Sequence, residues 1–126
     1  MAEGLAKNYF QDYKIYSAGI KPDPINQNAI TVMKNINIDI SQNYSKKINI
    51  EDLNKYNLII TLCGDAKDNC PIFQSDTKHI HWEIEDPAKF LGTDDEKLEK
   101  FSKIRDIIFK KIKLLKINLK KDLILI

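Results

Sequence analysis

Both cysteines of this chain lie in one short segment, "ITLCGDAKDNCP" (60–71), where Cys63 and Cys70 are separated by six residues. Four kinds of chemistry fit such a pair. The cysteines could be buried apolar side chains, zinc ligands, a redox-active pair, or a nucleophile with an incidental neighbour. In a reducing compartment a close pair is more often catalytic or metal-binding than a structural disulfide.

The residues around the pair argue against two of these alternatives, the buried apolar pair and the zinc site. Cys70 is flanked by polar residues, which does not suit a buried apolar cysteine. A zinc set would add His79 and His81. However, the gap of six residues exceeds the usual two to four, and we expect the strand "HIHW" (79–82) to point its two rings to opposite faces.

A redox pair requires that the two sulfur atoms can meet and separate. The intervening loop "GDAKDN" (64–69) is polar and contains a glycine, as in a flexible turn. Bridged cysteines need Cα atoms within about 7 Å of each other, whereas a helix would hold these two about 10 Å apart. We therefore expect a short helical turn in the reduced state that unwinds when a disulfide forms.

Composition limits the kind of protein that carries this pair. The 126 residues are 43% hydrophobic and 30% charged, with a net charge of +2, as in one ordinary globular domain without a nucleic-acid partner. No apolar run approaches the ~20 residues of a membrane span, and the first ten residues do not resemble a secretory signal. We expect a cytoplasmic protein with no membrane partner.

Hydrophobic periodicity predicts alternating helices and strands, and therefore an α/β fold with a mostly parallel sheet. In such sheets chemistry gathers at the carboxyl ends of the strands, and Cys63 ends the most apolar strand. The segment 36–40 is expected to be an extended loop. The expected helices are 2–12, 26–35 and 92–117, the last capped by Thr93 or Asp94, and the expected strands are 14–20, 57–63 and 79–82.

Several motifs occur in a recognisable order: "MAEGLAKNY", "YSAGI", "LIITLCGDAKDNCP", "HW", "EDPA" and "GTDDEKLEKFSKIRDII". In these motifs the chain resembles the thioredoxin-coupled arsenate reductases, which share the fold of the low-molecular-weight tyrosine phosphatases. The resemblance implies a three-layer α/β sandwich with a mostly parallel sheet, formed by a single domain over residues 1–126.

The resemblance also implies roles for individual residues. In that family a nucleophilic cysteine attacks arsenate, a second displaces arsenite by forming a disulfide, and a third passes the disulfide to thioredoxin. Cys63 matches the second cysteine and Cys70 the third. Asp86 matches a general acid, although an Asp-Pro pair is also a common start of a turn. Phosphatase relatives usually carry aromatic residues where this chain has Ala88 and Lys89.

One part of the family pattern has no match in this sequence. The family opens with a strand and a Cys-x5-Arg loop, whereas this chain begins at the Met of the phrase that follows the loop, so it resembles an N-terminally truncated member. The only arginine, Arg105, lies on the expected last helix and is not expected to replace the loop arginine. Alternative functions are therefore a non-catalytic fragment, a redox-active binding module, or a relative of the tyrosine phosphatases.

The missing strand leads to a prediction about the sheet. In the family it lies between the strands that match 14–20 and 57–63. These two segments are expected to be parallel, not bonded to each other, and separated by a gap one strand wide. An alternative is that the apolar tail "DLILI" (122–126) folds back and fills the gap.

Cofactors are not expected. One branch of the family binds potassium through residues that match Glu3 and Ser17, with an aspartate at the position of Lys46. A lysine there would repel the ion, so we expect neither potassium nor another metal.

Overall fold

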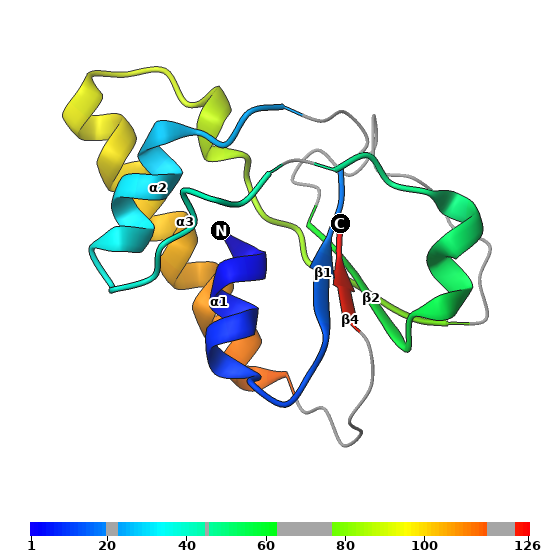
Figure 1. Ribbon diagram of the computed structural model, residues 1–126. Coiled ribbons are helices and arrows are strands. Elements are labelled where there is room, and N and C mark those ends of the chain that lie inside the picture. Colours follow the sequence, from blue (N-terminus) through cyan, green and yellow to red (C-terminus); the bar gives the residue numbers. More distant parts are fainter. Residues whose placement is uncertain (20–22, 45, 63–76, 116–122) are drawn as a thin grey trace.

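The computed structural model describes residues 1–19, 23–44, 46–62, 77–115 and 123–126. The helices are α1 (Ala2–Tyr9), α2 (Gln27–Lys34) and α3 (Asp94–Leu114), with 3-10 turns η1 (Ile50–Lys55) and η2 (Pro87–Lys89). The strands are β1 (Ile15–Ser17), β2 (Leu58–Thr61), β3 (Lys78–His81) and β4 (Leu123–Leu125). Helices and strands alternate along the described chain, as the periodicity predicts, except that β2 is followed by β3 across residues outside the described ranges (Figure 1).

Helix α3 begins at the predicted cap. The Thr93 side chain accepts a hydrogen bond from the Glu96 backbone N–H, and the Glu96 carboxylate accepts one from the Thr93 N–H, which together form a capping box. Three acidic residues in the first turn complement the helix dipole. The helix buries one stripe of apolar side chains: Phe101, Ile104, Ile108 and Ile112.

The other two helices are shorter. Asn26 caps α2 by accepting a hydrogen bond from the Asn28 N–H at 2.8 Å. Helix α1 ends at Tyr9, three residues before the predicted end, because the backbone leaves the helical region at Phe10. Gly4 lets α1 approach the segment after α2 closely, since a Cβ atom there would lie 2.8 Å from Ile40 Cγ2.

All four strands are parallel, in the order β1-β4-β2-β3. The prediction that the first two expected strands are not bonded to each other is confirmed, because β4 pairs with both of them. The predicted gap is not left open. The tail fills it, as in the alternative derived from the sequence, since an unpaired backbone between two strands would leave N–H and C=O groups without partners.

Strand β4 continues its pairing to the end of the chain. The Ile126 N–H donates to the Ile60 carbonyl at 2.7 Å, and the Ile126 carbonyl accepts from the Leu62 N–H at 2.8 Å. On the other side the Leu125 carbonyl accepts from the Ala18 N–H at 3.1 Å. The carboxyl end of β4 therefore lies between those of β1 and β2.

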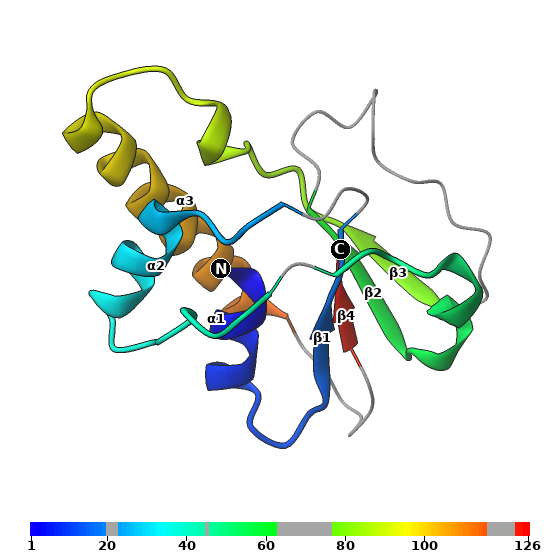
Figure 2. The same ribbon diagram turned by 45° about the horizontal axis from the view of Figure 1, so that its top comes forward.

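The sheet separates two apolar clusters. Helices α1, α2 and α3 cover one face, which we call the helical face, while η1 lies over the other, the η1 face (Figures 1 and 2). Leu58 and Ile60 of β2 join the large cluster of the helical face, whereas Ile59 packs with Leu53 in the small cluster of the η1 face. In the part of the chain that the structure describes, no helix is long and apolar enough to span a membrane.

Candidate functional site

The predicted site lies where the strands end. Strand β2 ends at Thr61, and its neighbour β3 ends at His81, so the segments that follow both strands leave from the same edge of the sheet. Cys63 and Cys70 fall outside the described residues. The structure therefore places the start of the cysteine segment at the expected edge and does not test the pair itself.

Asp86 follows β3 at this same edge. Its side chain is exposed and accepts a hydrogen bond from the Ala88 N–H at 3.0 Å, which caps the turn η2. This is the turn-forming role that an Asp-Pro sequence predicts. The oxygen that accepts this hydrogen bond is Oδ1 of the Asp86 carboxylate.

A cavity of about 310 Å³ opens beside the carboxyl ends of β1 and β4. The first turn of α1, the start of α2 and the segment 40–46 form its walls. Its lining combines apolar and polar side chains, among them Glu3, Ser17, Asn26, Asn43, Tyr44 and Lys46.

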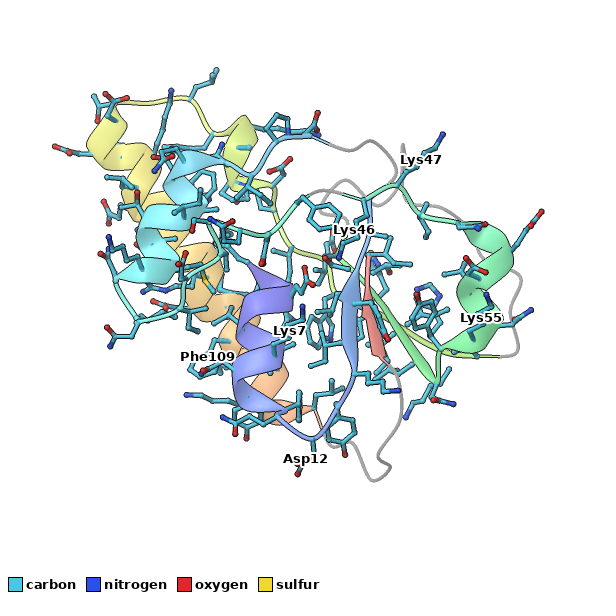
Figure 3. All side chains as sticks on the ribbon, viewed as in Figure 1. Lys7, Asp12, Lys46, Lys47, Lys55 and Phe109 are labelled. Atoms are coloured by element: carbon cyan, nitrogen blue, oxygen red, sulfur yellow. The ribbon has the colours of Figure 1, made fainter. Side chains whose placement is uncertain are left out.

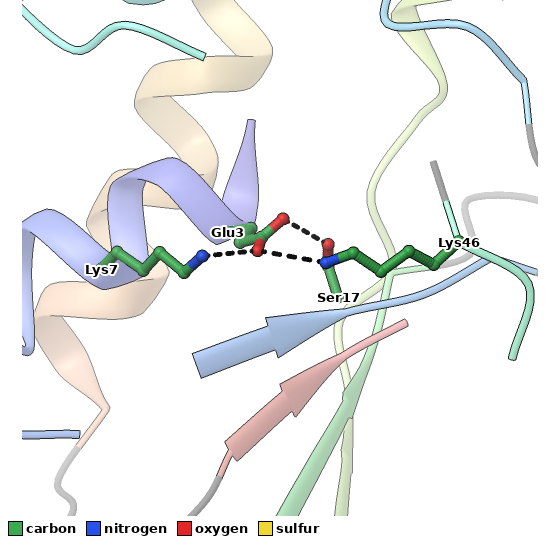
Figure 4. A network of polar contacts seen from close by, with 4 residues as sticks. All are labelled: Glu3, Lys7, Ser17 and Lys46. Atoms are coloured by element: carbon green, nitrogen blue, oxygen red, sulfur yellow. Dashed lines mark hydrogen bonds and ion pairs between the residues drawn. The ribbon is translucent and has the colours of Figure 1, made fainter. Parts of the chain in front are cut away.

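The best-defined polar network of this cavity centres on Glu3, which is only 8% exposed. Ser17 at the end of β1 donates its hydroxyl to Glu3 Oε2 at 2.5 Å, and Lys7 donates to Oε1 at 2.8 Å. The Lys46 ammonium lies 3.8 Å from the same Oε1. Figure 4 shows Lys7 and Lys46 approaching the carboxylate from opposite sides.

These partners decide the charge of Glu3. Burial by itself disfavours the ionised carboxylate, but the hydrogen bonds from Lys7 and Ser17 and the charges of Lys7 and Lys46 outweigh it. The pKa of Glu3 is therefore lowered below its ordinary value, and the group carries a full negative charge at neutral pH. We call Glu3, Lys7, Ser17 and Lys46 the Glu3 network.

The backbone at the end of β1 holds Lys46 in position. The Gly19 N–H donates to the Lys46 carbonyl at 2.8 Å, and the Ile48 N–H donates to the Gly19 carbonyl at 2.9 Å. Lys47, the next residue, is exposed and points away from the cavity (Figure 3). The alternation of an extended segment thus directs Lys46 toward Glu3 and Lys47 into solvent.

The two histidines contradict one expectation from the sequence. His79 Nε2 lies 3.0 Å from the Thr61 hydroxyl, and His81 Nδ1 lies 2.7 Å from the same oxygen. The rings therefore share one face of β3, and the prediction of opposite faces was wrong. Side chains two residues apart on a strand point the same way, because the alternation has a period of two.

Arg105 connects two helices. Its guanidinium donates from Nη1 to the Val32 carbonyl at 2.7 Å and from Nε to Asp106 at 2.9 Å. It thereby links α3 to the last turn of α2 on the helical face.

Comparisons with known proteins agree with this fold. A family model of the low molecular weight phosphotyrosine protein phosphatases matches residues 1–124. The chain belongs to this family.

Several relatives within the family are arsenate reductases. One from Halalkalibacterium halodurans is 48% identical over 114 residues, which is 90% of this chain and 82% of the relative. One from Bacillus subtilis is 46% identical with the same coverage. A solved arsenate reductase in the oxidized state superposes with a TM-score of 0.71 at 28% identity, and covers 90% of this chain and 83% of that one.

One feature of the site cannot be derived from the sequence, and a second has a sequence signal. Thr61 belongs to an apolar run, and nothing in the sequence shows that its hydroxyl meets both histidines. Lys7 comes four residues after Glu3, a spacing that favours an ion pair on a helix and that could have been noticed.

Proposed function

We propose that this chain acts in the reduction of arsenate to arsenite, with Cys63 and Cys70 as the thiols that carry the resulting disulfide and thioredoxin as the reductant. The observation that carries the proposal is 48% identity to an arsenate reductase over 90% of the chain, a match long enough to include most of the cysteine segment. A thioredoxin partner also implies the reducing environment of the cytoplasm.

The proposed relay balances in electrons. A thiolate attacks arsenate and forms an arsenic–sulfur bond while an oxygen leaves as water. Cys63 then attacks that sulfur, so that two thiols lose two electrons and arsenic(V) leaves as arsenic(III) in arsenite. Cys70 takes over the disulfide with Cys63, and thioredoxin reduces it by thiol–disulfide exchange.

The first attack requires a third thiolate, whereas the sequence contains two cysteines. A second candidate function is a redox-active module that carries out only the exchange between Cys63 and Cys70. One observation favours it: β4 pairs with both β1 and β2 in the place that the resemblance assigns to the strand before the nucleophile.

We assign Asp86 the role of general acid for the leaving oxygen. Its exposed position after β3 supports this, because the segments that follow β2 and β3 leave from one edge of the sheet. The hydrogen bond from the Ala88 N–H would fix the orientation of the carboxyl group while Oδ2 faces the substrate.

We further propose that the protein works without potassium. Both Glu3 oxygens already have partners, Lys7 on Oε1 and Ser17 on Oε2, and the Lys46 ammonium adds a second positive charge. This set does not fit a potassium site, because an ion would meet a lysine where it needs an oxygen ligand. The expected result is equal thermal stability in sodium and potassium chloride at the same ionic strength.

The test compares residues 1–126 with a fusion that adds, before Met1, the strand and Cys-x5-Arg loop of the Halalkalibacterium halodurans relative. Arsenite is measured with thioredoxin, thioredoxin reductase and NADPH. We expect no measurable turnover by residues 1–126, since even one lost oxyanion donor costs ~100-fold or more. The fusion should turn over, which would establish that the residues of this chain support the reaction.

Variants of the fusion separate the roles. Cys63→Ser should abolish arsenite release, whereas Cys70→Ser should release one equivalent and then stop. Asp86→Asn should slow release, with Glu85→Gln as the matched control, because Glu85 is also exposed and pairs with Lys100. Arsenate turnover by residues 1–126 that Cys63→Ser removes would show that no added loop is needed.

The exchange module is tested separately on residues 1–126. Mild oxidation should join Cys63 to Cys70, and mass spectrometry should show that thioredoxin restores both thiols. If both thiols remain free under oxidant, the relay proposal fails for both candidate functions.

A further inference from the structure

One side chain of helix α3 contacts both ends of the turn that carries Asp86. The Lys100 ammonium donates a hydrogen bond to Glu85 Oε2 at 2.6 Å. The same nitrogen lies over the Phe90 ring, 5.6 Å from its centroid, which is within the range of a cation–π contact. Glu85 comes directly before Asp86, and Phe90 comes directly after η2. Lys100 therefore holds the segment 85–90 at its two ends.

Core packing fixes the two elements that Lys100 connects. Phe101, the next residue on α3, is 3% exposed, and Ile84, the residue before Glu85, is 6% exposed. Both side chains belong to the large apolar cluster of the helical face. Beyond Ile84 the chain leaves this cluster, and Glu85 and Asp86 are exposed. The Lys100 side chain, itself 24% exposed, thus ties a segment outside the core to a helix that the core holds.

We infer that Lys100 is a positioning residue for Asp86, and this inference rests on the proposed role of Asp86 as general acid. Asp86 Oδ1 accepts a hydrogen bond from the Ala88 N–H, which belongs to the same turn. That bond orients the carboxyl group within η2, but it does not determine where η2 lies relative to the edge of the sheet. The contacts of Lys100 with Glu85 and Phe90 do so. Position matters because a displacement of about 1 Å can slow catalysis by up to ~100-fold.

Charge and shape determine which substitutions preserve the two contacts. Exposed ion pairs contribute little to the free energy of unfolding, so the expected effect is on the position of the turn and not on stability. Arginine also pairs with carboxylates and stacks on aromatic rings, so Lys100→Arg should keep both contacts. Lys100→Met keeps the stem of the side chain and loses both. Glu85→Ala removes the carboxylate acceptor, whereas Glu85→Gln keeps an oxygen that accepts from the ammonium.

How firmly the turn is held is measured on the chain without the fused loop, and this measurement does not depend on activity. NMR relaxation gives the order parameters of the Asp86 and Ala88 backbone N–H groups. In Lys100→Met they should fall from about 0.85, the value of rigid backbone, toward about 0.6. Lys103→Met is the matched control, because Lys103 pairs with Glu99 within α3 at 3.1 Å, and it should leave both order parameters unchanged. Unchanged values in Lys100→Met would overturn the inference.

The effect on chemistry is measured in the fusion that carries the Cys-x5-Arg loop, in single turnovers with enzyme in excess over arsenate. At saturating enzyme, Lys100→Met should slow arsenite release about 10-fold, a part of the ~100-fold or more that a general acid contributes. The enzyme concentration that gives half the maximal rate should not change, and Lys100→Arg should restore most of the rate. In an Asp86→Asn background, Lys100→Met should cause no further loss, because the group that it positions is absent. An undiminished loss in that background would overturn the inference. If the parent fusion releases no arsenite, the proposed function is contradicted, and the order parameters still decide whether Lys100 holds the turn.

Discussion

Two neighbouring residues of the same type on β2 face different environments. Ile60 and Ile59 are both fully buried, but Ile60 lies in the large cluster under three helices, whereas Ile59 packs in the small cluster with Leu53. The helical face buries the large apolar cluster, and the cavity with the Glu3 network opens at its edge. The η1 face combines a small apolar cluster with the polar group of Thr61 and the two histidines. The first face holds most of the apolar core, whereas the second places exposed polar side chains next to a small cluster.

The largest expected effect comes from shortening the two isoleucines of this comparison. Ile60→Ala should lower the free energy of unfolding by about 3–5 kcal/mol, because a rigid packed surrounding cannot collapse around the cavity. Ile59→Ala removes the same atoms and should cost only about 2–3 kcal/mol, since the smaller cluster can relax. Urea denaturation of both variants measures the difference. Equal losses would show that the two faces are packed equally well.

The second prediction concerns the strand that separates β1 from β2. Ile124→Pro removes an amide N–H from the centre of the sheet and should cost about 2–3 kcal/mol, the penalty of leaving a buried partner unsatisfied. Ile124→Thr keeps the amide and serves as the control. Hydrogen exchange should show that the Ala18, Leu62 and Ile126 amides lose protection in the proline variant. Unchanged protection would mean that β4 does not hold the sheet together.

A third prediction concerns the close packing of α1 against the segment after α2. Alanine favours a helix by about 1 kcal/mol over glycine, yet Gly4→Ala should destabilise the protein by about 1–3 kcal/mol, because its Cβ would meet Ile40 Cγ2 at 2.8 Å. Gly92→Ala, in the exposed loop before α3, should stay within about 0.5 kcal/mol, because the atom nearest to its Cβ, Phe90 Cε1 at 3.0 Å, belongs to a side chain that can move aside. Thermal unfolding of both variants provides the measurement. A stabilised Gly4→Ala protein would show that the helical face has spare space.

The smallest expected effect depends on pH. The pKa of Glu3 is lowered in the folded chain from an ordinary value of 4.5, so its ionised form favours folding above that pH. This stabilisation should be lost as the pH falls from about 4.5 through the lower pKa of the folded state. Glu3→Gln should therefore flatten the acid limb of the stability profile, whereas Glu51→Gln, at an exposed position, should not. Identical acid limbs in all three proteins would contradict the role of the Glu3 network.

Local signals identified most of the fold in advance. Thr93 with Glu96, Asn26 before α2, and the apolar run that contains β2 each act within a few residues, so the sequence predicts where these elements begin. The end of α1 differs from the prediction: the helix ends at Tyr9, where the backbone turns at Phe10, and no glycine or proline in the sequence marks that turn. The turn η1 was not predicted, since its six residues show no clear periodicity.

The candidate site also has features that the sequence predicts and features that it does not. The positions of Cys63 after β2 and of Asp86 after β3 follow from the order of strands and motifs. The meeting of Lys46 with Glu3 depends on the bridge between Gly19 and Lys47, which joins segments far apart in the chain. The prediction that His79 and His81 point to opposite faces was wrong. Residues two apart on a strand share a face, so the sequence alone already placed both rings on one side of β3.

The sequence by itself determined the helices with their caps, the apolar strand before the cysteine segment and the family, because these depend on short-range patterns and on motifs in order. Only the tertiary structure decided what occupies the middle of the sheet. A three-residue strand such as β4 has a weak local preference, and its place follows from the unpaired backbone of β1 and β2 on either side. The same ladder decided that two exposed histidines meet at one buried hydroxyl.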